Sequence, residues 1–141
     1  MKADNTLYLI GKVRVLINQF IISELKKKGI NGIVPSHGNI ILSLLENNSL
    51  TMSELADKIG KDPSTITTLV KKLNDFGYTQ MIKDEEDKRV NRVSLTSKGK
   101  ELEEAFIIIS EQIHNKQYNN ISDDEKEIFR QVLKKMIDNF S

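Results

Sequence analysis

Cysteine and tryptophan are absent from this 141-residue chain, and proline and glycine occur only two and seven times. The lack of cysteine excludes disulfides, thiolate zinc sites and cysteine nucleophiles. Few turn-forming residues disfavour a fold built from many short strands. We therefore expect a mainly α-helical protein, and a chain of this length is long enough to bury a proper core.

Targeting and catalytic signals are also missing from the sequence. The first residues lack the order of basic, apolar and small side chains that marks a signal peptide, and we expect no apolar run long enough to cross a bilayer. No phosphate-binding glycine loop, nucleophile with a base or paired acid site occurs at credible spacing. The sequence thus predicts a cytoplasmic protein with no membrane partner, no enzymatic activity and no cofactor.

The net charge is only +1, but the charged residues are unevenly distributed along the chain. Residues 1–49 carry six basic and three acidic side chains, residues 50–100 carry ten and eight, and residues 101–141 carry five and nine. An anionic ligand is therefore expected on the first two thirds of the chain, with the acidic last third facing elsewhere.

Apolar residues recur at helical spacing in six segments, which cover about residues 5–28, from 36 to about 46, 51–60, 62–76, from 96 onward and from 122 onward. Ser36 is expected to cap the second segment. Thr51 and Glu54 have capping-box spacing at the start of the third, and Asp62 with Pro63 predicts the start of the fourth. A short helix, a tight turn and a second capped helix together predict a helix-turn-helix.

The helix at 62–76 has one apolar stripe and one polar face. The polar face combines small hydroxyl residues with two lysines, namely Ser64, Thr65, Thr67, Thr68, Lys71 and Lys72. Hydroxyl groups can hydrogen-bond to base edges, and lysines can contact phosphates, so this face is suited to the major groove of DNA. The alternative is a surface helix that happens to be rich in threonine.

A β-hairpin is predicted directly after this helix. Its strands cover 80–83 and 92–95, joined by a charged loop at 84–91 with Lys88 and Arg89 at its tip. An arginine at such a tip can enter a minor groove, and Asp87 is placed to hold its guanidinium group. Arg92 adds a further positive charge for DNA. The alternative is a charged turn that only keeps the hairpin soluble.

These residues carry a family resemblance. The run DEEDKRVNRVSLTSKG is similar to the wing signature of MarR-family transcriptional regulators, and the segment LTMSELADKIGKDPSTITTLVKKLNDFGY resembles the helix-turn-helix of the same family. The resemblance is strong over about residues 36–104. It implies a winged helix-turn-helix lobe at 35–100 and a helical dimerisation bundle from 1–34 and 101–141, together forming one domain.

The resemblance also implies a function. A homodimer would bind a near-palindromic double-stranded operator, usually as a repressor released by a small ligand. Many family members carry arginine where this chain has Thr68, which puts a strong guanine contact in doubt. The apolar segments at both ends are suited to the dimer interface, although they could instead form a bundle within one monomer.

An effector site is the least defined feature of the sequence. Tyr8, Val13, Ile17 and His37 are candidates to line a ligand pocket, but all four could simply be core or capping residues. His37 and His114 are far apart in sequence and lack a third ligand nearby, so no metal site is predicted. A winged-helix module that binds proteins instead of DNA is the alternative function, but that use favours exposed apolar anchors over hydroxyls and lysines.

Overall fold

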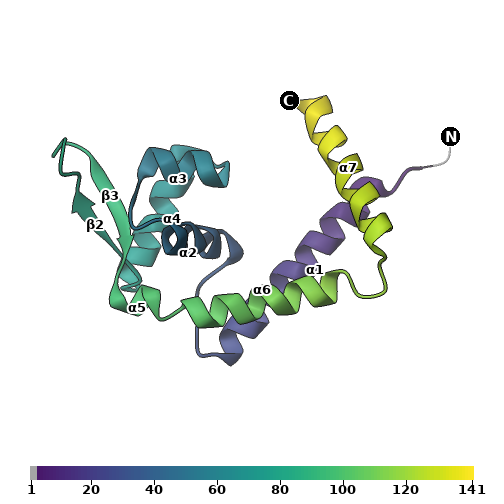
Figure 1. The fold of residues 1–141 in the computed structure, drawn as a ribbon, viewed down its shortest axis with the longest axis horizontal. Coiled ribbons are helices and arrows are strands. Elements are labelled where there is room, and N and C mark those ends of the chain that lie inside the picture. Colours follow the sequence, from purple (N-terminus) through teal and green to yellow (C-terminus); the bar gives the residue numbers. More distant parts are fainter. Residues whose placement is uncertain (1–2) are drawn as a thin grey trace. The chain divides into compact units, whose positions relative to one another are not determined.

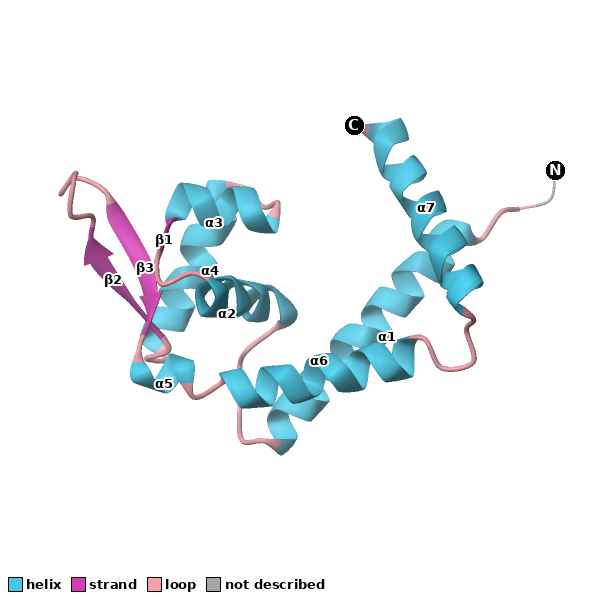
Figure 2. Ribbon diagram, in the orientation of Figure 1, coloured by secondary structure: helices cyan, strands magenta, loops and turns pink. Residues whose placement is uncertain are grey.

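The computed structural model describes residues 3–141 and consists mainly of helices with one small sheet (Figures 1 and 2). The elements follow in the order α1 (Thr6–Lys27), α2 (Pro35–Glu46), β1 (Leu50–Thr51), α3 (Met52–Ile59), α4 (Pro63–Asp75), β2 (Thr79–Lys83), β3 (Asn91–Leu95), α5 (Ser97–Lys100), α6 (Glu103–Gln117) and α7 (Asp123–Phe140). They form two compact units, one extending to Ile109 and one starting at Ser110. The predicted mainly α fold with a β-hairpin is confirmed.

The core of the first unit lies between α2, α3, α4 and the sheet. The largest fully buried side chains of the described residues lie there, namely Ile40, Ile41, Leu55, Ile66, Val70, Leu73 and Val93. They come from the apolar stripes of three helices and from the inward-facing position of β3. Burying such stripes against one another supplies most of the stability of short helices.

The sheet has three antiparallel strands in the order β1-β3-β2. In the predicted hairpin Thr79 pairs with Leu95 and Lys83 with Asn91, so each strand is one residue longer than expected. The strand β1 was not predicted. It is two residues long and pairs Leu50 with Val93, a partner far along the chain, so no local periodicity could reveal it.

Most helix boundaries follow local capping chemistry. The Thr51 side chain accepts from the Glu54 amide at 3.1 Å while Glu54 accepts from the Thr51 amide at 3.0 Å, which confirms the predicted capping box. The expectation that Ser36 caps α2 was wrong. This helix begins at Pro35, and Nδ1 of His37 accepts a hydrogen bond from the amide of its N-cap Val34 at 3.1 Å.

The single long helix expected from residue 96 is two helices, α5 and α6. Thr96 does cap the first, but this helix ends after one turn. A Cβ on Gly99 would lie only 2.1 Å from the backbone oxygen of Tyr78, the residue before β2, so α5 approaches that backbone too closely for any side chain at this position. Leu102 is buried at the break, and α6 then begins with two acids in its first turn, which suits the positive end of the helix dipole.

Helix α1 presents a largely apolar and largely exposed surface. Leu7 is 83% exposed, and only Leu25 of this helix is buried. Among the described residues, α1 is the one helix long and apolar enough to cross a membrane by length and composition, so the expectation that no run reaches this length was wrong. One such helix is weak evidence for a membrane, because core helices and signal sequences pass the same test.

The second unit contains the end of α6 and all of α7. Ser122 and Glu125 form the predicted capping box at the start of α7, with both hydrogen bonds at 3.1 Å. None of the described residues of α7 is buried, and its apolar side chains, among them Phe129, Ile137 and Phe140, are exposed. The assignment of both ends of the chain to a dimerisation bundle stays a prediction.

Candidate nucleic-acid interface

The start of α4 is fixed by one carboxylate. Asp62 accepts from the Thr65 amide at 2.8 Å, from the Thr65 hydroxyl at 3.0 Å and from the Ser64 hydroxyl at 2.6 Å. These hydrogen bonds, with the Ser64 hydroxyl contributing most, lower the pKa of Asp62 to about 2. The N-cap therefore stays ionised and the helix start stays ordered across the physiological pH range.

The predicted hydroxyl face of α4 lies on the side away from the core. Ile66, Val70 and Leu73 are buried, while Ser64, Thr67 and Thr68 are exposed and Thr65 is half-buried. Farther along the same helix Lys71 and Lys72 are exposed, and the Lys72 ammonium lies 5.8 Å from the centroid of the Phe76 ring. The structure thus brings all six predicted residues of this helix onto its outer surface.

Acidic side chains stabilise the loop between β2 and β3 through hydrogen bonds. The Asp84 carboxylate accepts from the amides of Glu86 and Asp87, which lowers its pKa, the amide of Asp87 contributing most. At the tip, the Asp87 carboxylate accepts from Nε and Nη2 of Arg89 at 3.0 Å each, and from the Arg89 amide at 3.0 Å.

The ion pair between Asp87 and Arg89 favours the charged form of each side chain. The side-chain hydrogen bonds with Arg89 are the main cause of a lowered Asp87 pKa, and those with Asp87 raise the pKa of Arg89. The Arg89 side chain is nevertheless 90% exposed. A fixed but exposed guanidinium is already oriented before any ligand arrives, which reduces the entropy lost on binding. Lys88 next to it is exposed as well.

Arg92 is placed differently from the other predicted DNA contacts. Its Nε donates to the Ser49 hydroxyl at 2.8 Å, its Nη2 to the Ser49 backbone oxygen at 3.1 Å, and its Nη1 to Asp84 at 3.2 Å. The Glu54 carboxylate lies 3.6 Å from Nη2 as well. Only 26% of the side chain is exposed. Arg92 therefore ties the loop end of the hairpin to the segment preceding α3.

Sequence reasoning missed the partners of Arg92. Ser49 lies 43 residues before it and belongs to no recognisable motif, so no sequence signal could have found it. In the sequence, Asp84 is only one of four consecutive acidic residues. Its two roles, folding the loop and holding Arg92, depend on the hairpin register.

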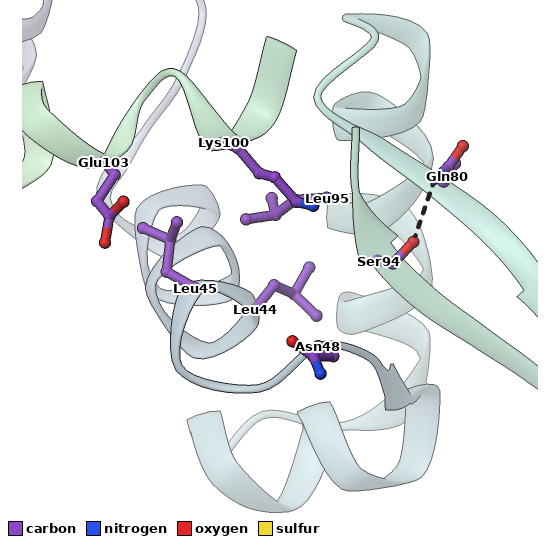
Figure 3. Close-up of a pocket in the computed structure, with 8 residues that line it drawn as sticks. All are labelled: Leu44, Leu45, Asn48, Gln80, Ser94, Leu95, Lys100 and Glu103. Carbon is purple, nitrogen blue, oxygen red and sulfur yellow. Dashed lines mark hydrogen bonds between the residues drawn. The ribbon is translucent and has the colours of Figure 1, made fainter. Parts of the chain in front are cut away.

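The four candidate ligand residues do not line a common pocket in the part of the chain that the structure describes. Tyr8 and Val13 are exposed on α1, Ile17 is half-buried, and His37 is buried on α2. A pocket of about 360 Å³ lies elsewhere, between the end of α2, the hairpin and the α5–α6 junction (Figure 3). Three leucines and five polar residues line it, namely Leu44, Leu45, Asn48, Gln80, Ser94, Leu95, Lys100 and Glu103.

The surroundings of the buried His37 favour its neutral form. Burial is the main cause of the lowered pKa of His37, and the nearby Lys72 adds to the shift. Its Nδ1 accepts a hydrogen bond, which the protonated ring could not do. Among the described residues, no group of three or more histidines, cysteines and acids is arranged to hold a metal ion.

Helices α3 and α4 with the hairpin behind them define a winged helix-turn-helix protein. A family profile described as MarR family matches residues 34–91. The chain is 30% identical over 100 residues to the HTH-type transcriptional regulator SarZ of Staphylococcus haemolyticus, a match covering 71% of this chain and 67% of that protein. The chain belongs to the MarR family.

Other relatives agree with this assignment. The chain is 30% identical over 101 residues to the HTH-type transcriptional regulator PapX of Escherichia coli, covering 72% of this chain but only 62% of that protein. These relatives are named as regulators, in agreement with the expectation that the chain is not an enzyme.

Solved structures share the fold. The S. aureus MepR–DNA complex superposes with a TM-score of 0.86 at 22% identity, covering 97% of this chain and 99% of that one. BpsR of Bordetella bronchiseptica, described by its regulation of DNA binding by 6-hydroxynicotinic acid, has a TM-score of 0.83 at 16% identity and covers 98% of both chains.

Proposed function

We propose that this protein is a homodimeric, sequence-specific DNA-binding regulator of transcription that recognises a near-palindromic duplex. The observation that carries the proposal is the pairing of two surfaces on one lobe. The outer face of α4 is made of hydroxyls and lysines, and the neighbouring wing carries an exposed arginine held in place by Asp87. In this arrangement α4 occupies the major groove and Arg89 the adjacent minor groove.

The homodimer is supported by the apolar surface at both ends of the chain. Exposed leucines, isoleucines and phenylalanines on α1 and α7 make a larger apolar surface than a monomer usually leaves in water. A second copy would cover this surface and place two recognition helices about one helical turn of DNA apart. Such a two-fold dimer would bind two half-sites in inverted orientation.

Regulation by a small ligand is also part of this proposal. Repression relieved by a small ligand requires only that the ligand bind one spacing of the two lobes better than the other. The description of BpsR, whose DNA binding responds to 6-hydroxynicotinic acid, supports such an effector. A cytoplasmic location is part of this proposal, because the duplex lies there.

The test is fluorescence anisotropy of the purified chain on the intergenic duplex beside its own gene, with a scrambled duplex as the control. We expect tighter binding to the native duplex and an affinity that falls steeply with salt, because lysine contacts release counterions from phosphates. Equal and weak binding to both duplexes, repeated with duplexes drawn from the rest of the genome, would contradict the proposal and favour a winged helix that binds proteins.

A further inference from the structure

The hydroxyl protons on the outer face of α4 are already used inside the helix. Ser64 and Thr65 donate to Asp62, Thr67 donates to the Pro63 backbone oxygen at 2.9 Å, and Thr68 donates to the Ser64 backbone oxygen at 3.1 Å. Each hydroxyl therefore points its lone pairs, not its proton, toward the solvent. The face presents hydrogen-bond acceptors together with the methyl groups of the threonines.

Asp62 strengthens this acceptor character. Its pKa of about 2 keeps the carboxylate charged at the N-terminal end of the same face. A fixed negative charge there opposes the O6 and N7 acceptors of guanine and favours exocyclic amino groups, which donate. The lysines that could donate to guanine, Lys71 and Lys72, come later in the helix than the threonines.

The bases differ in how well their major-groove edges match a face of acceptors and methyl groups. Adenine and cytosine offer an amino donor, guanine offers two acceptors, and thymine alone offers a C5 methyl group. An A·T pair thus presents both an amino group for a threonine oxygen and a methyl group for a threonine methyl. A G·C pair presents the cytosine amino group but no methyl.

We propose that this protein selects its half-sites through acceptor oxygens and methyl contacts from Thr67 and Thr68, and therefore prefers A·T pairs at the positions facing these residues. This inference rests on the proposed function, since it specifies which duplex the site takes. The donation of each threonine hydroxyl to a backbone carbonyl fixes its side-chain rotamer, so the methyl group is held in one position before binding.

The experiment selects duplexes from a random library with the full chain and sequences those retained. We expect enriched half-sites with A·T pairs in the major-groove positions. In a selected duplex, each thymine is then replaced by uracil, which removes only the C5 methyl. We expect affinity to fall about fourfold at contacted positions, the effect of one buried methyl or methylene group.

Two matched variants assign the contacts to individual residues. Thr67→Ser keeps the hydroxyl and removes the methyl, so it should lose the response to uracil at one position of each half-site. Thr67→Val keeps the methyl and removes the hydroxyl, so it should keep the response to uracil and lose discrimination for the amino group. The same pair of changes at Thr68 should act at a neighbouring position, and thermal unfolding confirms that each variant is folded.

The outcomes separate this inference from the proposed function. Enrichment of half-sites with guanine at these positions, or unchanged affinity for uracil at every thymine, would overturn the inference while leaving a sequence-specific regulator. A library with no enrichment at all would overturn the proposed function, and the inference would fall with it.

Discussion

Arg92 on β3 holds Ser49 with two hydrogen bonds, one to its hydroxyl at 2.8 Å and one to its backbone oxygen at 3.1 Å. Ser49 directly precedes β1, and β1 runs into α3. The same guanidinium binds Asp84 at the start of the wing loop. One side chain therefore connects the wing to the first helix of the helix-turn-helix.

The first prediction concerns this connection. Arg92→Ala should lower the free energy of unfolding by about 1–3 kcal/mol, because hydrogen bonds to a half-buried charged group are lost and Ser49 is left without a partner. Ser49→Ala should also weaken DNA binding, because it removes one of the hydrogen bonds that hold Arg92 and, through it, the wing. Urea unfolding and anisotropy on the same duplex measure the two effects.

The double variant decides how Arg92 acts. If the arginine works through Ser49, the two substitutions should be non-additive, with a coupling of about 0.5–3 kcal/mol. Additive losses in DNA affinity would instead support the sequence-based hypothesis that Arg92 contacts DNA directly.

A second prediction concerns the wing tip. Arg89→Ala should weaken operator binding by about tenfold or more and leave thermal unfolding almost unchanged, since the side chain is exposed. Asp87→Asn should cause a smaller loss, because the arginine remains but is no longer held by a carboxylate. Equal affinity of Arg89→Ala and the unaltered chain in anisotropy would remove the wing from DNA recognition.

A third prediction compares two glycines. Gly99→Ala should destabilise the protein by about 1–3 kcal/mol, because the new methyl group meets the backbone oxygen of Tyr78, which cannot move freely. Gly11→Ala in α1 meets nothing within 4 Å, so it should stabilise by up to about 1 kcal/mol. In denaturant unfolding, the two variants should change the free energy of unfolding in opposite directions relative to the unaltered protein. Equal changes would contradict the close approach at Gly99.

A fourth prediction concerns the chain ends. Replacing Ile137 and Phe140 with glutamine should reduce self-association, because both are exposed apolar residues of α7 that a second copy would cover. Light scattering coupled to size exclusion measures the mass. Lys135→Gln, at an exposed polar position of the same helix, serves as a control. A dimer of undiminished stability in the double variant would exclude α7 from the interface.

A fifth prediction concerns pH. The lowered pKa of His37 means that the unfolded chain binds a proton more readily than the folded one, so stability should fall as pH drops below about 6.5 and on through the folded pKa. His37→Asn should remove this component, and its amide oxygen can still accept from Val34. His114→Asn controls for the loss of a histidine. A pH slope that persists unchanged in His37→Asn would contradict the assignment.

Much of the fold was predictable because its signals are local. Two helix starts are marked by side chains that hydrogen-bond within three residues, Thr51 with Glu54 and Asp62 with Thr65, and both starts are where the sequence placed them. The residues of the hydroxyl face were found in the same way, because helical spacing alone puts them on one side of α4.

The sequence by itself thus determined the helix-turn-helix, the hairpin and the pairing of Asp87 with Arg89, all of which arise between near neighbours in the chain. Tertiary structure alone decided the partner of Arg92, the strand β1 and the close approach of Gly99 to the backbone of Tyr78. In each of these the deciding contact joins segments far apart in sequence, such as Ser49 with Arg92 or Tyr78 with Gly99. Only the packed core brings such segments together, so no local pattern can carry their signal.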